Sequence, residues 1–446
     1  MSNVATAEFG APDFDAIVVG AGPAGAAAAL ELARAGRNVC LVERGPFPGS
    51  KNMYGGVVYG RILDTLVPNW WEEAPVQRWV TRRQTMILTE TAATTLDVRN
   101  EAWGAPPYNG ATAYRPDFDS WLAQKAVDAG AVLVCSTTVT GLLHKDGRPD
   151  GPVVGVRTDR PDGDLTAKVV IACDGVNSFL AKEAGLYPPS DPANYTVGVK
   201  ETIALPREVI DERFGVRGDH GVDIEILGCT GDIPGGGFVY TNLDTVAVGL
   251  VLSLPALSKG SQRPEQLLAR LKAHPAVAPL VEGGDVKEYS AHVIPEAGLD
   301  MMPELIGDGI LVAGDAAAMC LAAGIWLEGV NFAIGSGAAA GRAAARAVQR
   351  NDTSAAGLEG YRSRLESSFV LADHRRLRDA PHLVMGDLAQ QKMPRIVNGI
   401  VEDLFTVTNP EPKPRLRTIV RRQMKRHGVK WRDAVKDGLR AARTFG

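Results

Sequence analysis

Residues 15–43 read DAIVVGAGPAGAAAALELARAGRNVCLVE, and this stretch decides the fold. The β-branched run at 15–20 predicts a strand, the Ala- and Leu-rich pattern at 23–35 a helix, and 38–42 a second strand. The turn between the first strand and the helix matches G-x-G-x-x-G, and an acidic residue closes the second strand. This order predicts an α/β protein with a Rossmann-like dinucleotide-binding domain.

Each part of this turn has a mechanical reason. Gly20 allows the sharp exit from the strand, Gly22 leaves room for a pyrophosphate, and Gly25 lets the helix lie close on the sheet. The free N–H groups at the start of the helix would bind phosphate oxygens, and Glu43 would accept hydrogen bonds from ribose hydroxyls. The cofactor-binding residues expected here are Gly20, Ala21, Gly22, Pro23, Ala24, Gly25, Glu43 and Arg44.

Composition places the chain among globular proteins. It has 446 residues, 45% hydrophobic and 22% charged, which is enough for two or three domains. The net charge of −4 gives no basis for a nucleic-acid partner. Twelve Lys or Arg and two Asp give residues 413–446 a net charge of +10, so that the preceding body carries −14.

Metal and export signals are missing from the sequence. The five cysteines, Cys40, Cys135, Cys173, Cys229 and Cys320, lie too far apart for the short spacings of zinc, haem or iron–sulfur sites. The seven histidines are scattered, and we expect no metal site. Residues 1–15 have no basic n-region and no apolar h-region of a secretory signal. We therefore expect a cytoplasmic protein with reduced thiols.

Residues 316–341 carry a single charge, Glu328, and resemble a membrane span at first sight. Their apolar content is mostly Ala and Gly, which contribute little to insertion, so the pattern favours a buried helix. Gly335-Ser336-Gly337 lies inside this helical pattern, and we reject it as a second nucleotide motif.

A late strand distinguishes FAD from NAD. Residues 310–312 form an apolar run that Gly314 and Asp315 follow, and a simple NAD fold has no use for this element. It resembles the strand that re-enters the first sheet in FAD enzymes of the glutathione-reductase superfamily, where an Asp binds the ribityl chain. The alternative is an ordinary Asp that caps a helix. The resemblance implies FAD as the cofactor.

Three further segments resemble Group 2 flavoproteins. Residues 115–122 are similar to the R-x-x-F/L-D-x-x-L helix, with Arg115 toward the cofactor, and residues 169–178 contain a D-G signature. Residues 324–331 resemble the segment beside the isoalloxazine, where a helix N-terminus would stabilise reduced flavin. The alternatives are a capped helix, a strand-ending turn and a buried helix. The site residues expected outside the glycine turn are Asn52, Gly55, Gly56, Arg115, Val139, Asp174, Gly175, Gly314, Asp315, Gly324, Gly329, Val330 and Asn331.

The strand and helix patterns divide the chain into three parts. The FAD-binding domain is expected in three pieces, residues 13–75, 115–190 and 300–350. Residues 76–114 and 191–299 read as strands and predict an inserted antiparallel sheet on the substrate or quinone side. Residues 351–446 read as helical and end in the basic tail 413–446. Chemistry specific to this protein is expected where the inserted sheet meets the FAD-binding domain.

Three segments narrow the resemblance to one family. Residues 49–59, 234–242 and 400–407 look like the FixC branch of the electron-transfer-flavoprotein:quinone oxidoreductases. This resemblance runs from about residue 13 to the C-terminus. It implies electron transfer from the reduced α/β electron transfer flavoprotein, through FAD, to a membrane quinone. Long members hold a [4Fe-4S] cluster on four C-terminal cysteines, whereas only Cys320 lies beyond residue 300 here. A cluster would therefore come from a small, separate ferredoxin-like subunit.

The sequence contains no recognisable group of residues for acid–base catalysis, and we expect no catalytic residue of that kind. Two other functions stay open: a geranylgeranyl-reductase-like or hydroxylase-like FAD enzyme that uses NAD(P)H, and a flavin-bound scaffold subunit of an electron-transfer complex.

The basic tail alternates cationic with apolar residues. This pattern predicts a pair of amphipathic helices on an acidic subunit or an anionic membrane, and hence a peripheral position on the cytoplasmic face of the membrane. The alternative is a solvated basic helix packed on the body. Trp70, Trp71 and Trp79 would form either a membrane-interface or quinone-entry rim or part of the core.

Overall fold

The computed structural model describes residues 11–52, 55–189, 191–324 and 327–445. The expectation for the first ten residues lies outside this range. So do Met53 and Tyr54, which belong to a segment that carries the family resemblance, and Ile325 and Trp326, which belong to the segment that resembles Group 2 flavoproteins.

The first sheet has eight strands: β1 (Phe14–Val19), β2 (Val39–Val42), β7 (Val132–Val134), β8 (Val139–His144), β9 (Val153–Thr158), β10 (Leu165–Ala172), β16 (Ile306–Gly307) and β17 (Ile310–Val312). Their order is β16-β17-β10-β1-β2-β7, and β8 and β9 extend from β10. The central strands from β17 to β7 run parallel. The late strand β17 thus returns to the first sheet beside β10, which confirms the predicted Rossmann-like architecture.

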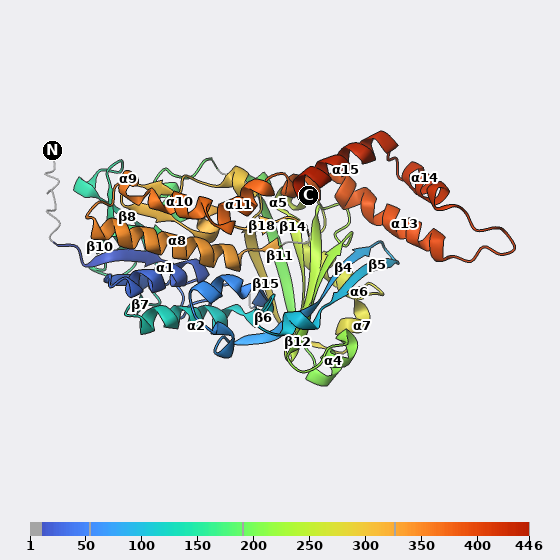
Figure 1. Ribbon diagram of the computed structural model, residues 1–446, viewed down its shortest axis with the longest axis horizontal. Coiled ribbons are helices and arrows are strands. Elements are labelled where there is room, and N and C mark those ends of the chain that lie inside the picture. The colour runs from blue at the N-terminus through green and yellow to red at the C-terminus, as the bar shows by residue number, and fades with distance from the viewer. Residues whose placement is uncertain (1–10, 53–54, 190, 325–326, 446) are drawn as a thin grey trace.

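Helices α1 (Pro23–Arg34), α2 (Arg115–Asp128) and α8 (Val330–Gln349) pack on this sheet, and α1 also packs against both α2 and α8 (Figure 1). The buried helix expected over residues 316–341 begins only at Val330. Before it come a short 3₁₀ turn and the strands β18 (Leu321–Ala322) and β19 (Leu327–Glu328). The Ala and Gly content has a packing cause: a Cβ on Gly337 would lie 2.0 Å from the Ala24 carbonyl oxygen of α1. Small residues therefore let α8 and α1 approach closely.

The second sheet has nine strands: β3 (Gly55–Val58), β4 (Val76–Leu88), β5 (Ala93–Arg99), β6 (Ala111–Tyr114), β11 (Tyr195–Ala204), β12 (His220–Leu227), β13 (Gly235–Thr241), β14 (Thr245–Ser253) and β15 (Asp285–Pro295). Their order is β15-β11-β14-β13-β12-β4-β6-β3, with β5 paired to β4. The sheet differs from the expected antiparallel one because β4 and β12 run parallel. These two strands come from separate chain segments, so no hairpin fixes their relative direction.

Strand β3 also belongs to this second sheet, through its pairing with β6. The sequence patterns place its residues in the first piece of the FAD-binding domain, but the pairing with β6 depends on a segment more than fifty residues away. Apolar side chains on one face of the second sheet pack against α4 (Arg207–Phe214), α6 (Pro264–Ala273) and α7 (Ala278–Val281). The short helix α5 (Leu254–Lys259) packs on β14 of this sheet, whereas α3 (Phe179–Glu183) contacts β8 of the first sheet.

The C-terminal region is helical, as predicted. Its helices are α9 (Ala355–Leu358), α10 (Gly360–Glu366), α11 (Phe369–Arg376), α12 (Ala380–Val384), α13 (Met393–Phe405), α14 (Leu416–Arg426) and α15 (Trp431–Phe445), with a π-helical turn at Leu388–Lys392. Helices α13 and α14 pack together as a hairpin that projects from the body (Figure 1). Within the described residues, no helix combines the length and the apolar character needed to cross a membrane.

The tryptophan cluster belongs largely to the core. Trp70 is 1% and Trp79 5% exposed, their ring centroids lie 5.8 Å apart, and Trp79 stacks on Tyr108. Only Trp71 is half-buried. The cluster therefore gives no membrane-facing or quinone-entry rim.

Candidate functional site

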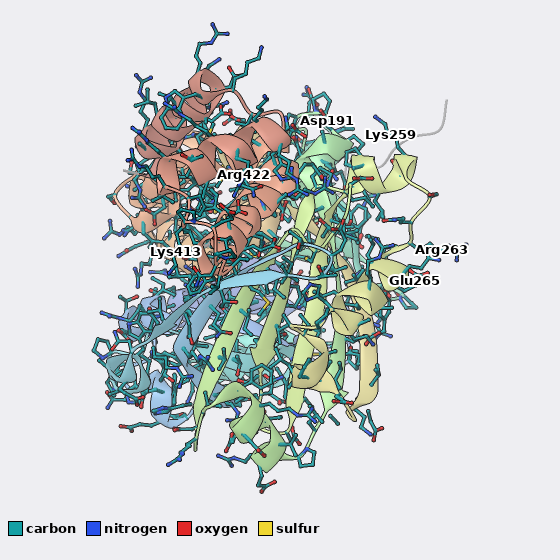
Figure 2. All side chains as sticks on the ribbon, turned by 90° about the vertical axis from the view of Figure 1, so that its right-hand side faces the viewer. Asp191, Lys259, Arg263, Glu265, Lys413 and Arg422 are labelled. Carbon is teal, nitrogen blue, oxygen red and sulfur yellow. The ribbon has the colours of Figure 1, made fainter. Side chains whose placement is uncertain are left out.

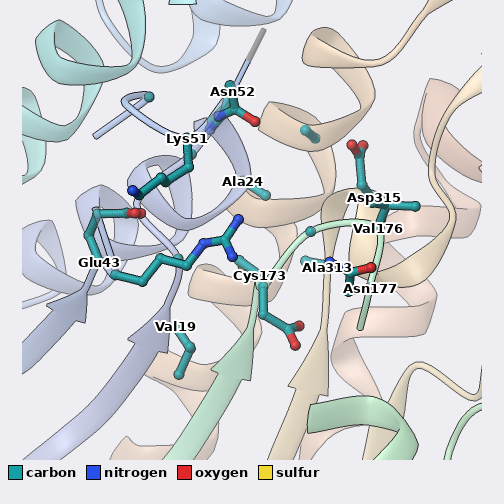
Figure 3. Close-up of a pocket in the computed structure, with 18 of the residues that line it drawn as sticks. Val19, Ala24, Glu43, Lys51, Asn52, Cys173, Val176, Asn177, Ala313 and Asp315 are labelled. Atoms are coloured by element: carbon teal, nitrogen blue, oxygen red, sulfur yellow. The ribbon is translucent and has the colours of Figure 1, made fainter. Parts of the chain in front are cut away.

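A cavity of about 330 Å³ opens at the carboxyl ends of β1, β2, β10 and β17, where parallel α/β sheets bind their ligands (Figure 3). Fourteen of the predicted site residues line it: Gly20, Gly22, Pro23, Ala24, Glu43, Arg44, Asn52, Arg115, Val139, Asp174, Gly175, Asp315, Gly329 and Val330. These residues come from segments that are hundreds of positions apart in the sequence, and the first sheet brings their ends together.

The glycine turn has the shape that a dinucleotide requires. Gly20 has φ +96°, and a Cβ there would lie 2.3 Å from the Cys173 carbonyl oxygen. A Cβ on Gly25 would lie 1.8 Å from the Gly20 carbonyl oxygen, so α1 is pressed against the end of β1. A Cβ on Gly22, by contrast, would meet no described atom within 4 Å. Gly22 thus faces open space at the start of α1, which fits the pyrophosphate of FAD.

Glu43 is buried at one end of the cavity. Its Oε2 accepts a hydrogen bond from the Ala21 N–H at 2.9 Å, and its Oε1 accepts one from the Gly45 N–H at 2.7 Å. Each oxygen keeps a second lone pair for a ribose hydroxyl. Ala21 therefore acts by holding the carboxylate and does not itself line the cavity. Figure 3 shows Lys51 beside Glu43, on the cavity side.

Arg115 lines the cavity, but its guanidinium is already paired. Its Nε and one terminal nitrogen each donate to the Asp119 carboxylate at 2.8 Å, and Asn52 donates to the same carboxylate at 3.3 Å. Asp119 is fully buried; burial raises its carboxyl pKa, and Arg115 opposes that shift. Arg115 thus lines the cavity while its guanidinium is ion-paired with Asp119.

The carboxyl groups of Asp315 and Asp174 also line the cavity, and Figure 3 shows Asp315 on the side away from Glu43. Burial raises the pKa of Asp315, while Arg115 and His292 lower it. Burial also raises the pKa of Asp174, whose Oδ2 accepts from the Leu180 N–H at 3.1 Å. The Oδ1 of Asp174 is buried and has no hydrogen-bond partner among the described residues. A buried acceptor without a donor, aimed at the cavity, fits a bound ligand with hydroxyl or imide groups.

Seven predicted residues do not line the cavity: Ala21, Gly25, Gly55, Gly56, Gly314, Gly324 and Asn331. Gly25 and Gly314 instead permit close packing, since a Cβ on Gly314 would lie 2.8 Å from that of Ala24. Gly55 and Gly56 lie in β3. Asn331 donates to the Glu328 carboxylate, although the flanking Gly329 and Val330 do face the cavity.

Sequence reasoning missed several lining residues, among them Lys51, Thr137, Thr138, Asn177 and His292. Lys51 lies inside a segment that carried the family resemblance and was open to prediction. His292 was not, because it lies on β15 of the second sheet, far from any cofactor motif. Burial lowers the pKa of His292 and thereby favours the neutral imidazole.

Comparison with known proteins also indicates that this chain binds FAD. An "FAD binding domain" family model matches residues 13–213. FixC of Escherichia coli O157:H7 is 41% identical over 431 residues, covering 96% of this chain and 98% of the relative. The probable electron transfer flavoprotein-quinone oxidoreductase YdiS of Escherichia coli K12 is 40% identical over 430 residues, with the same coverage.

Solved structures share the fold at low identity. A geranylgeranyl bacteriochlorophyll reductase-like protein from Thermoplasma acidophilum has a TM-score of 0.70 at 20% identity, covering 95% of this chain and 98% of that one. The flavin-dependent brominase Bmp2 has a TM-score of 0.66 at 16% identity, covering 96% and 99%.

Proposed function

Because the chain belongs to the FixC family and is an FAD-dependent oxidoreductase, we propose that it passes electrons from a reduced electron transfer flavoprotein, through FAD, to a membrane quinone. The observation that carries the proposal is the similarity to FixC and YdiS over 96% of the chain. The finer placement of the FAD-binding half within the glutathione-reductase superfamily is part of the same proposal.

The residues of the cavity would hold FAD in an extended pose. The turn from Gly20 to Gly25 and the start of α1 would bind the pyrophosphate, and Glu43 the adenosine ribose. Asp315 would bind the ribityl chain, and the N-terminus of α8 at Gly329 would face the ring. The bound flavin supplies the ability to take and release electrons one or two at a time. The protein's part is to position the ring and to exclude water around it.

A separate iron–sulfur subunit is the second element of the proposal. Among the described residues, no group of three or more His, Cys, Asp and Glu is placed to hold a metal ion. Only Cys320 lies beyond residue 300 in the whole sequence. Both observations support a small ferredoxin-like partner as the carrier of any cluster.

A peripheral membrane contact is the third element, and the C-terminal helices support it. Phe405 is 83%, Val407 69% and Trp431 67% exposed, although large apolar side chains normally avoid water. Lys430 and Arg432 flank Trp431 in the sequence, and Figure 2 shows Lys413 and Arg422 on this C-terminal segment beside the second sheet. Apolar side chains flanked by cations fit an anionic lipid surface on the cytoplasmic side.

A donor comparison tests the proposed function. The FAD-loaded chain is supplied either with reduced electron transfer flavoprotein and a short-chain quinone, or with NAD(P)H and a prenyl or phenolic substrate. We expect turnover with the first pair only. Robust turnover with NAD(P)H would instead assign a reductase or hydroxylase activity. If quinone reduction by the assembled complex survives removal of this chain's FAD, the chain is a scaffold.

A further inference from the structure

Strand β12 separates two kinds of side chain. Val222, Ile224 and Ile226 alternate on the face that packs against the helices of the second sheet. Asp223 and Glu225 point to the opposite face and are nevertheless buried, at 6% and 7% exposed. Two ionisable groups inside a sheet face are costly unless their charges are compensated.

A single guanidinium compensates both carboxylates. Arg83, the register partner of Asp223 on β4, donates to the Glu225 carboxylate, and its Nε lies 3.7 Å from Asp223 Oδ2. Since two negative charges face one positive charge, ionisation of both carboxylates would leave one excess charge in a buried place. Glu225 makes the close contact with Arg83, which leaves Asp223 as the group that holds a proton. Burial, and then Glu225, raise the pKa of Asp223, while Arg83 lowers it.

The same sheet face reaches the FAD cavity at His292, because the strand registers place His292 of β15 on the face that carries Asp223. Tyr59 follows β3, and the centroid of its ring lies 5.7 Å from the guanidinium carbon of Arg83. The negative charge of Glu328 on β19 contributes to the raised pKa of Tyr59. Glu328 is the direct neighbour of Gly329, which lines the cavity. Asp223 and Glu225 therefore lie on the face that meets the FAD cavity, in the sheet expected on the quinone side of the flavin.

Two more polar side chains, those of Tyr240 and Lys200, lie on the same face of the second sheet. Tyr240 of β13 is the other register partner of Asp223. Its hydroxyl lies 3.2 Å from Lys200 Nζ, which donates to the Gly55 carbonyl oxygen of β3 at 2.9 Å. Among the described residues, the titratable and charged groups that interact with Asp223 are thus Arg83, Glu225, Tyr59 and Tyr240.

We propose that Asp223 is the proton donor for the two-electron acceptor, with Arg83 and Glu225 as positioning residues that keep it protonated between turnovers. This inference rests on the proposed function. Reduction of a quinone to a quinol takes two electrons and two protons. The bound flavin, in its reduced form, would supply both electrons and one of the two protons. Asp223 gives the second proton, which forms an O–H bond on the quinone, and then takes a proton from water.

Stopped-flow oxidation of the photoreduced, FAD-loaded full chain tests this role. A short-chain quinone needs protons, whereas ferricyanide takes electrons alone. We expect Asp223→Asn to slow the quinone reaction by about 100-fold, the scale of general acid catalysis, and to leave the ferricyanide reaction unchanged. In the wild type the quinone rate should fall as the pH rises and Asp223 loses its proton. Glu201→Gln, which removes the partner of Lys272 on the opposite face of the sheet, is the control and should match the wild type in both reactions.

A second variant and a spectrum keep the test decisive if Asp223→Asn folds poorly. Glu225→Gln removes the competing charge, so the fall in quinone rate should move to lower pH. The infrared difference spectrum between the wild type and Asp223→Asn at pH 7 should contain the C=O band of one protonated, buried carboxyl group.

Three results would overturn the inference: equal quinone rates in the wild type and Asp223→Asn, equal losses with quinone and ferricyanide, or no shift in Glu225→Gln. A wild type that reduces ferricyanide but no quinone would contradict the proposed function, and the infrared band would then decide the protonation of Asp223 separately.

Discussion

Gly25→Ala is the sharpest perturbation of the cofactor turn. The added methyl carbon would lie 1.8 Å from the Gly20 carbonyl oxygen, and real Cβ atoms keep at least 3.0 Å, so α1 must retreat from β1 by about 1.2 Å. The obstacle is backbone rather than a flexible side chain, and α1 is buried against α8. Overpacking of this kind costs about 3 kcal/mol. We expect loss of FAD together with a melting temperature of the FAD-free protein roughly 3 °C lower.

Gly22→Val is the matched control for this clash. Gly22 has φ −71° and ψ −175°, which any residue adopts, and its Cβ would meet no described atom within 4 Å. The FAD-free variant should therefore lose less than about 1 kcal/mol, the scale of a poorer helix cap. The side chain would nevertheless occupy the path of the pyrophosphate and abolish flavin retention. Flavin absorbance of the purified proteins and thermal unfolding of their FAD-free forms measure both effects. An unchanged melting temperature in Gly25→Ala, or normal flavin content in Gly22→Val, would refute the reasoning.

Three other perturbations have defined outcomes. Burial lowers the pKa of Lys200 to about 8, so between about pH 8 and 10.5 the unfolded chain binds a proton that the folded chain has released, and stability rises with pH. In urea unfolding, the free energy of unfolding of the wild type relative to Lys200→Met should rise by about 2 kcal/mol between pH 7.5 and 9.5. A difference that stays constant with pH would contradict this. Arg115→Met leaves the Asp119 carboxylate buried without its cation and should lower the free energy of unfolding by about 3–5 kcal/mol. The double variant Arg115→Met/Asp119→Leu should restore most of this loss. A double variant that is no more stable than the single one would argue against an unpaired charge as the cause. Deletion of residues 413–446 should abolish salt-sensitive cosedimentation with anionic vesicles, and undiminished binding would exclude the tail as the contact.

The first sheet was predictable because its signals are local. The turn around Gly22 and the strand at 310–312 each carry their geometry in a few adjacent residues, and both were found where expected. The buried helix was placed too early because Ala and Gly report close packing against α1 without marking where a helix starts. Its actual start at Val330 depends on the pairing of β18 with β19, which is too short to leave a pattern.

The second sheet was predictable in outline only. Alternating apolar residues indicated strands, yet the parallel pairing of β4 with β12 and the recruitment of β3 depend on contacts between distant segments. The same long-range pairing brings His292 to the cavity and Arg83 to Asp223, so no local pattern announces either. Site residues from the first sheet were therefore within reach of sequence reasoning, and those from the second were not.

Flavin absorbance during one sequential mixing experiment tests the proposed electron path most directly. The FAD-loaded chain is mixed anaerobically with reduced electron transfer flavoprotein and then with a short-chain quinone. We predict that the FAD of this chain is bleached in the first step and recovers its absorbance in the second. FAD that stays oxidised beside the reduced flavoprotein, but is bleached by NAD(P)H, would contradict the proposed path.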